Sequence, residues 1–141
     1  MAFRPYLAFA GNCREAFTHY QSVFGGELVL LTMADTPPDA GPPPEGASLD
    51  AIMHAALTNG DELLMGADDP SGNFDGNVNG MCVNYAAADG GEAKRVYDAL
   101  AEGGEVQMPL GETFFSPAFG MCKDRFGTPW MIMVEAEAPP A

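Results

Sequence analysis

His54 is the side chain of this 141-residue protein best suited to proton transfer near neutral pH. Its ordinary pKa, about 6.5, suits a general acid or base. It lies in the apolar stretch Ile52-Met53-His54-Ala55, where an imidazole needs a hydrogen-bond partner. Two interpretations stay open: a structural histidine, and a residue that lines a cleft as general base or ligand. His19 lies in a predicted helix and is expected to be exposed.

Other side chains give weaker signals. Glu112 comes just before Thr113 and Phe114, near a predicted strand end from which it could reach a cleft. The alternative for Glu112 is a solvated turn carboxylate. Asp124 and Arg125 are expected to form turn hydrogen bonds or a surface pair, and Trp130 packs in the core or walls a cleft.

The sulfur-containing residues predict neither a disulfide framework nor a zinc motif. The three cysteines are odd in number and no two have CxxC spacing, so we expect partly buried thiols. Nine methionines are present, and their flexible thioethers suit varied apolar ligands. Among those in predicted strands are Met53, Met65, Met81, Met121, Met131 and Met133. Ordinary packing in a sheet core is the alternative for these six.

The elements that position these residues occur twice. Asn12-Cys13-Arg14-Glu15-Ala16 and Asp89-Gly90-Gly91-Glu92-Ala93 each begin an amphipathic helix, and Gly25-Gly26 and Gly103-Gly104 end them. Asn12 and Asp89 are the expected N-caps of these helices. Four strand-like segments accompany each helix. The predicted strands are Tyr6–Ala10, Glu27–Ala34, Leu49–Thr58, Glu62–Gly66, Met81–Ala86, Glu105–Leu110, Ala118–Cys122 and Pro129–Glu135.

This repetition predicts one α+β domain of two tandem βαβββ units, over residues 1–141. We expect unit one at 1–68, a linker at 69–79 and unit two at 80–137. Two four-stranded antiparallel sheets would form an open cleft, with the helices outside. The proline-rich loop 35–46 is either a flap near a site or a passive insertion. Asp68, Asp69 and Asp75 have no calcium-loop spacing and are expected in solvated turns.

Composition excludes some partners. The formal net charge is −14, with six Lys plus Arg, and such a field repels nucleic acids and anionic membranes. No long apolar run predicts a membrane span, and the N-terminus lacks an apolar signal core. We therefore expect a cytoplasmic protein that binds neither nucleic acid nor membrane.

The order of several motifs resembles PhnB-like proteins of the vicinal oxygen chelate superfamily, which includes glyoxalase I, bleomycin resistance proteins and extradiol dioxygenases. The resemblance covers almost the whole chain and implies the βαβββ duplication and a homodimer. It rests on Pro5-Tyr6-Leu7-Ala8-Phe9-Ala10-Gly11-Asn12, Ala16-Phe17-Thr18-His19-Tyr20, Ile52-Met53-His54-Ala55, Leu64-Met65-Gly66-Ala67-Asp68, Glu112-Thr113-Phe114-Phe115 and Asp124-Arg125-Phe126-Gly127-Thr128-Pro129-Trp130-Met131-Ile132. Some members are labelled demethylubiquinone methyltransferase-like, but no glycine-rich loop follows a strand as a Rossmann-like cofactor site requires.

The resemblance also implies four positions for ligands of a divalent metal, usually His, Glu or Gln. In this sequence the positions carry other residues: Pro5 or Tyr6, Leu64 or Met65, Cys82 to Asn84, and Met131. We therefore expect no cofactor and no metal site of the usual kind, although a divalent metal is possible. The predicted binding residues are Tyr6, His54, Met65, Cys82, Asn84, Glu112, Phe114, Met131 and Met133.

Two functions remain open. The first is metal-independent binding of a small apolar or aromatic molecule in the cleft of a homodimer, as bleomycin resistance proteins do. The second is a lyase, isomerase or dioxygenase-type enzyme with an unusual site around His54, using Tyr6, Cys82 or Glu112. The ligand's identity is not encoded in any motif that we recognise.

Overall fold

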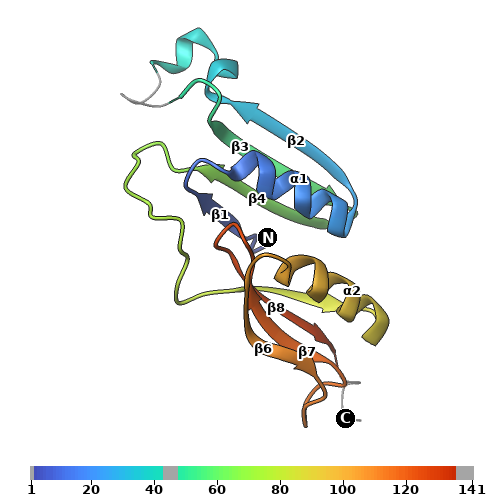
Figure 1. Cartoon of the computed structure of the whole chain (residues 1–141). Coiled ribbons are helices and arrows are strands. Elements are labelled where there is room, and N and C mark those ends of the chain that lie inside the picture. The colour runs from blue at the N-terminus through green and yellow to red at the C-terminus, as the bar shows by residue number, and fades with distance from the viewer. Residues whose placement is uncertain (1, 43–47, 136–141) are drawn as a thin grey trace. The chain divides into compact units, whose positions relative to one another are not determined.

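The chain consists of two βαβββ units, seen in a computed structural model that describes residues 2–42 and 48–135 (Figure 1). The first unit contains β1 (Tyr6–Phe9), α1 (Cys13–Phe24), β2 (Glu27–Thr32), β3 (Ile52–Asn59) and β4 (Glu62–Asp68). The second contains β5 (Val83–Ala87), α2 (Gly90–Ala101), β6 (Glu105–Gly111), β7 (Phe119–Lys123) and β8 (Pro129–Val134). The predicted duplication and fold class are therefore confirmed.

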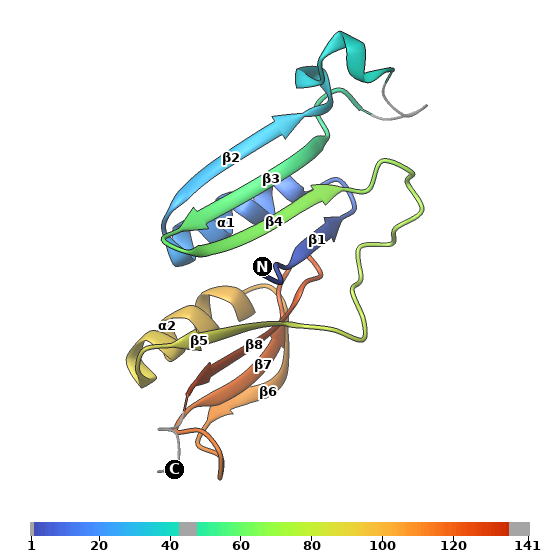
Figure 2. The same cartoon turned by 180° about the vertical axis from the view of Figure 1, so that it is seen from behind.

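Both sheets have the same topology, with strand orders β1-β4-β3-β2 and β5-β8-β7-β6. Each sheet is open and mixed: β1 pairs with β4, and β5 with β8, in parallel, while the other pairs are antiparallel (Figure 2). The expectation of purely antiparallel sheets was wrong in this detail. The connection through α1 makes β2 run in the same direction as β1. Two antiparallel steps, from β2 to β3 and from β3 to β4, then leave β4 parallel to β1, and β8 is parallel to β5 for the same reason.

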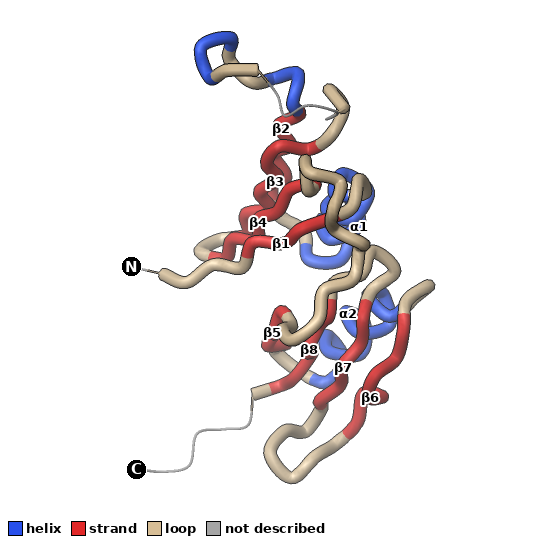
Figure 3. The backbone as a smooth tube through the Cα atoms, turned by 90° about the vertical axis from the view of Figure 1, so that its left-hand side faces the viewer, coloured by secondary structure: helices blue, strands red, loops and turns tan. Residues whose placement is uncertain are grey.

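Each helix covers one face of its own sheet, as Figure 3 shows for α1. The buried positions recur at helical spacing: Cys13, Ala16, Phe17, Tyr20 and Val23 in α1, and Ala93, Val96, Tyr97 and Leu100 in α2. Under α1, the ring of Phe9 meets Phe17 edge-on with centroids 5.9 Å apart. The core of each unit therefore lies between one helix and one sheet face.

The two helices begin differently. At α2 the carboxylate of Asp89 accepts a hydrogen bond from the Glu92 backbone N–H at 2.8 Å, and Glu92 accepts one from the Ala88 N–H. This is the predicted cap. At α1, Asn12 makes no side-chain cap, and its Oδ1 is buried without a hydrogen-bond partner among the described residues.

Asp68, the last residue of β4, takes over the role expected of Asn12. Its Oδ1 accepts hydrogen bonds from the backbone N–H groups of Gly11 and Cys13 at 3.1 and 3.0 Å. Its Oδ2 accepts from the Ile52 N–H at 2.8 Å. Asp68 is buried, so the expectation of a solvated turn was wrong for this residue. One carboxylate thus joins the starts of α1 and β3 to the end of β4.

Asp124 performs a similar task in the second unit. Its Oδ1 accepts from the backbone N–H groups of Phe126 and Thr128, and its Oδ2 accepts from the Trp130 indole at 2.8 Å. The predicted turn hydrogen bonds are confirmed. Trp130 is buried on the α2 side of the sheet, so the core interpretation of this residue is confirmed.

The remaining differences concern segment ends. Met81 precedes β5 rather than lying in a strand, and residues 33–35 form a short 3-10 helix instead of continuing β2. A second 3-10 helix spans Pro38–Ala40, and positions 43–46 of the proline-rich loop lie outside the described residues, as does 136–137 of unit two. Contacts group residues 69–77 with the first unit. No helix in the described ranges is long and apolar enough to span a membrane.

Replacing Asp68 with alanine should lower the free energy of unfolding by about 3 kcal/mol, because buried N–H groups lose a charged acceptor. Urea unfolding would measure this loss. Asp50→Ala is the matched control, since Asp50 is exposed and should change stability by less than about 0.5 kcal/mol. Equal effects of the two substitutions would contradict the proposed role of Asp68.

Candidate functional site

The strand register defines a second face on the first sheet, opposite α1. Tyr6 pairs with Met65, which pairs with Ala56, and Leu31 pairs with His54. Directly paired residues share a face, and Leu7 and Phe9 take the alternate, buried side. The open face therefore carries Tyr6, His54 and Met65, and the structure brings these three predicted residues together on one sheet.

Tyr6 and His54 form a side-chain pair on this open face. The Tyr6 hydroxyl lies 3.0 Å from His54 Nδ1, and the ring centroids are 5.8 Å apart with a 32° tilt. Burial, and to a smaller degree the nearby Cys13, raises the pKa of the Tyr6 phenol above its ordinary value. The phenol therefore keeps its proton at neutral pH and can donate a hydrogen bond to the imidazole. This pair supplies the hydrogen-bond partner that a histidine in an apolar strand needs.

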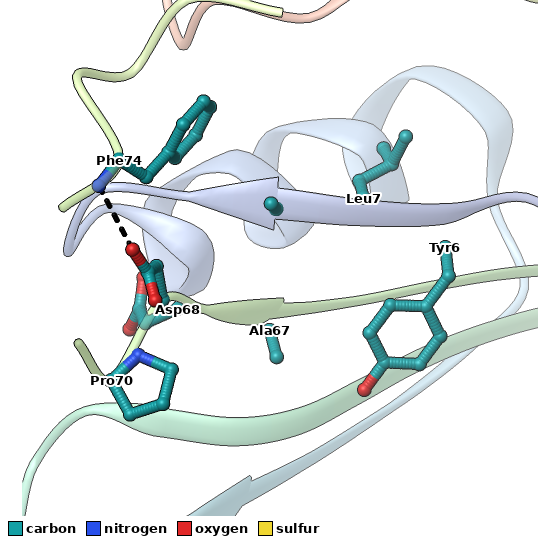
Figure 4. Close-up of a pocket in the computed structure, with 8 residues that line it drawn as sticks. Tyr6, Leu7, Ala67, Asp68, Pro70 and Phe74 are labelled. Carbon is teal, nitrogen blue, oxygen red and sulfur yellow. Dashed lines mark hydrogen bonds between the residues drawn. The ribbon is translucent and has the colours of Figure 1, made fainter. Parts of the chain in front are cut away.

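A pocket of about 440 Å³ lies beside Tyr6 in the first unit (Figure 4). Figure 4 shows Tyr6 at one end and Pro70 at the other, with Ala67 between them. The lining residues are Tyr6, Leu7, Ala8, Ala67, Asp68, Asp69, Pro70 and Phe74. Ala8 and Ala67 are opposite each other in the β1–β4 register, and their small side chains leave room above the sheet.

The far wall of this pocket is a turn held by Asp69. Its Oδ1 accepts from the Ser71 backbone N–H and hydroxyl at 3.0 and 2.8 Å, and its Oδ2 accepts from the Phe74 N–H at 2.9 Å (dashed line in Figure 4). These bonds, that from the Ser71 N–H foremost, lower the pKa of the Asp69 carboxyl below its ordinary value. The sequence predicts a linker at 69–79, which includes this turn. The structure shows that its first part is a folded edge of unit one.

The open face of the second sheet holds methionines. Asn84 pairs with Met131, Ala86 with Met133, and Met121 with Met131 across β7 and β8. Trp130 and Ile132 alternate with these residues and are buried toward α2. Asn84, Met131 and Met133 therefore share one sheet face, and a role for them in ligand binding stays a prediction.

Three other predicted residues lie apart from these sheet faces. Cys82 precedes β5, and Glu112 is exposed just after β6. Phe114 is fully exposed, and its ring packs edge-on against Phe115, which packs in turn against Phe119 with centroids 4.9 Å apart.

The pocket beside Tyr6 also contains residues that the sequence did not indicate. Ala8, Ala67, Pro70 and Phe74 carry no reactive group that could have indicated them. The small side chains of Ala8 and Ala67, in strands otherwise rich in large residues, are the signal that the sequence offers.

The donor atoms of the described residues bear on whether a metal of the usual kind could be held. Within residues 2–42 and 48–135, no three His, Cys, Asp or Glu side chains group so that they could hold a metal ion. Tyr6, His54 and Met65, which lie together on the open face of the first sheet, offer one phenol, one imidazole and one thioether. Thioether and phenol are poor partners for the divalent metals that imidazole and carboxylate sites hold.

The cysteines differ in burial, since Cys13 and Cys122 are buried and Cys82 is half-buried. Burial, and then the charge of Asp68, raises the pKa of the Cys13 thiol to about 12, and burial, and then Asp124, raises that of Cys122 to about 11. Because the thiolate is the reactive form, Cys13 and Cys122 should be inert at neutral pH.

A chromogenic aromatic disulfide at pH 7.5 should modify one thiol of the folded protein quickly, Cys82, and should modify all three only after unfolding. Cys82→Ser should abolish the fast reaction, and its persistence would contradict this assignment.

This chain is similar to known proteins over nearly its whole length. The family model described as 3-demethylubiquinone-9 3-methyltransferase matches residues 1–133. Protein YjdN of Escherichia coli is 35% identical over 147 residues, which cover 99% of both chains. Among solved structures, PA1353 of Pseudomonas aeruginosa has 42% identity and a TM-score of 0.84, with 96% of this chain and 98% of that chain covered.

Two further structures identify the branch and the fold. A PhnB protein of Bacillus cereus, described as a putative 3-demethylubiquinone-9 3-methyltransferase, has 26% identity and a TM-score of 0.76, covering 95% of this chain and 99% of that one. A glyoxylase/bleomycin resistance protein/dioxygenase domain of Frankia sp. shares the fold at 14% identity, with a TM-score of 0.61 and coverage of 96% and 98%. The chain belongs to the 3-demethylubiquinone-9 3-methyltransferase family, whose PhnB-like members have the glyoxalase/bleomycin resistance/dioxygenase fold.

Proposed function

We propose that this protein binds a small apolar or aromatic molecule, without a metal, at the open face of a sheet in a cytoplasmic homodimer. The observation that carries the proposal is the pocket beside Tyr6, with Ala8 and Ala67 at its base and Pro70 and Phe74 at its far end. Such a mostly apolar hollow with few polar groups suits an apolar ligand. The methionines on the face of the second sheet would suit the same class of molecule.

Metal independence rests on the donor atoms. The four positions at which related enzymes carry metal ligands hold proline or tyrosine, leucine or methionine, the Cys82–Asn84 segment, and Met131. Removal of divalent ions should therefore leave ligand binding unchanged. A binding protein needs no Lewis acid, since sequestration of a molecule involves no bond making.

An enzymatic role is the second candidate, and the hydrogen bond between Tyr6 and His54 favours it. As a general base, His54 would carry its proton on Nδ1, donate a hydrogen bond to the Tyr6 oxygen 3.0 Å away, and remove a proton from a bound molecule through Nε2. His54→Ala would then abolish turnover, whereas in a pure binding protein it would change affinity or stability alone. The family description names a methyltransferase, but we propose no methyl-transfer step, because the sequence offers no Rossmann-like cofactor loop.

The homodimer is proposed from the exposed apolar side chains on the open face of the first sheet. Val29 and Leu31 lie on β2, the edge strand of this sheet on the side away from β1, and are 54% and 39% exposed. Contiguous apolar side chains on a folded surface are usually covered by a partner. Sedimentation equilibrium should give twice the chain mass, and Val29→Lys together with Leu31→Lys should shift it toward the monomer mass. A monomeric parent protein would contradict this part of the proposal.

N-phenyl-1-naphthylamine, a neutral aromatic probe whose fluorescence rises in apolar sites, should bind the purified protein with micromolar affinity. Binding should be unchanged by excess EDTA. Ala67→Leu should weaken it at least about tenfold, because the added side chain fills the pocket. Ala34→Leu, at an exposed alanine outside the pocket, is the matched control. Loss of binding on metal removal, or equal binding by Ala67→Leu, would contradict the proposal.

A further inference from the structure

We propose that the Tyr6–His54 pair makes this pocket selective for neutral aromatic molecules that carry a carbonyl oxygen, which accepts a hydrogen bond from His54 Nε2–H. This inference rests on the proposed binding function and adds the chemical class of the ligand. It assigns Tyr6 a positioning role, because its hydroxyl determines which ring nitrogen of His54 carries the proton.

The direction of the hydrogen bond follows from acid–base chemistry. The Tyr6 hydroxyl keeps its proton because its pKa is raised, and a phenol O–H is a more acidic donor than the N–H of a neutral imidazole; the unprotonated ring nitrogen is in turn a better acceptor than the phenol oxygen. The Tyr6 O–H therefore donates to His54 Nδ1. In a neutral imidazole one nitrogen accepts and the other carries the proton, so the proton lies on Nε2.

That Nε2–H is available to a ligand. Tyr6 O–H is the hydrogen-bond partner of His54 in the described part of the chain, and it occupies Nδ1 alone. The imidazole is half-buried on the open face, beside the small or apolar Leu31, Ala56 and Met65. A ligand that covers this face removes water from Nε2–H. It must then supply an acceptor, or the covered donor costs free energy.

The pocket and the pair share one residue. Tyr6 lines the pocket through its ring and holds His54 through its hydroxyl. An aromatic body lying over Ala8 and Ala67 would therefore have its polar end near the imidazole. Neither a lysine nor an arginine lines the pocket, two aspartates do, and the whole chain carries a net charge of −14. This field disfavours a carboxylate or phosphate, so the acceptor oxygen belongs to a neutral group.

Selectivity of this kind is larger than apolar contact alone can provide. A site that covers a donor rejects an otherwise similar ligand without an acceptor, because the donor is then left unpaired. An apolar pocket without such a donor would treat the two ligands alike. The comparison of two probes with similar aromatic bodies therefore isolates the contribution of His54.

The test compares 6-propionyl-2-dimethylaminonaphthalene, which is neutral and carries a ketone, with N-phenyl-1-naphthylamine, which has none. Fluorescence titration would give the dissociation constant of each probe for the parent protein and for three variants. We expect His54→Leu to weaken ketone binding about tenfold, the loss of one covered hydrogen bond, and to change binding of the second probe by less than about twofold.

Two variants separate recognition from a structural effect. His54→Gln keeps an N–H donor and should recover most of the ketone affinity. Tyr6→Phe keeps the ring but frees the imidazole to place its proton on Nδ1, so ketone affinity should fall about threefold. His19→Leu, at the second histidine, is the matched control and should alter neither dissociation constant. Thermal unfolding of each variant would confirm that the fold is retained.

The outcomes are distinguishable. A ketone-specific loss in His54→Leu with recovery in His54→Gln supports the inference. Equal changes for both probes, or no change for either, overturn it while the proposed binding function survives. If neither probe binds the parent protein, the proposed function and the inference fail together.

Discussion

The carboxylate of Asp68 joins three segments of the first unit, and the arrangement of that unit depends on it. It accepts hydrogen bonds from backbone N–H groups at the start of α1, in the preceding turn, and at the start of β3. A helix leaves its first N–H groups without a partner inside the helix, so the Cys13 N–H at the start of α1 needs an acceptor of this kind. A negative charge there also interacts favourably with the helix dipole. One buried side chain thus connects the start of the helix to two strands of the sheet.

The open face of the first sheet is the one opposite α1. With α1 on one side, alternate residues of β1, β3 and β4 point to the other, and Tyr6, His54 and Ala67 are among them. Gly66 contributes on the covered side, since a Cβ there would come within 2.8 Å of the Phe17 ring. The close approach of helix and sheet therefore needs glycine on one side of β4, while the next residue, Ala67, keeps the pocket open on the other.

The two units use the same topology with different chemistry. In the second unit, Asp124 ties the β7–β8 turn to the Trp130 indole, and Asp89 caps α2 locally. Glu92 also accepts the Tyr85 hydroxyl at 2.6 Å; burial, and then this bond, raises the Tyr85 pKa to about 12. Similar backbones are therefore held by different polar contacts, and the Tyr6–His54 pair belongs to the first unit.

The sequence by itself determined the duplication, the helices and most strand positions, because apolar spacing and glycine stops are local signals. It also indicated Tyr6, His54 and Met65 as candidates, through residue type and resemblance. The tertiary structure alone decided that Asp68 is a buried cap, since its partners lie 16 to 57 positions away in the chain. It likewise decided the parallel pairing of β1 with β4, which places Ala8 opposite Ala67, and the contact of Tyr6 with His54. Such long-range pairs depend on sheet register, and no local pattern in the chain encodes it.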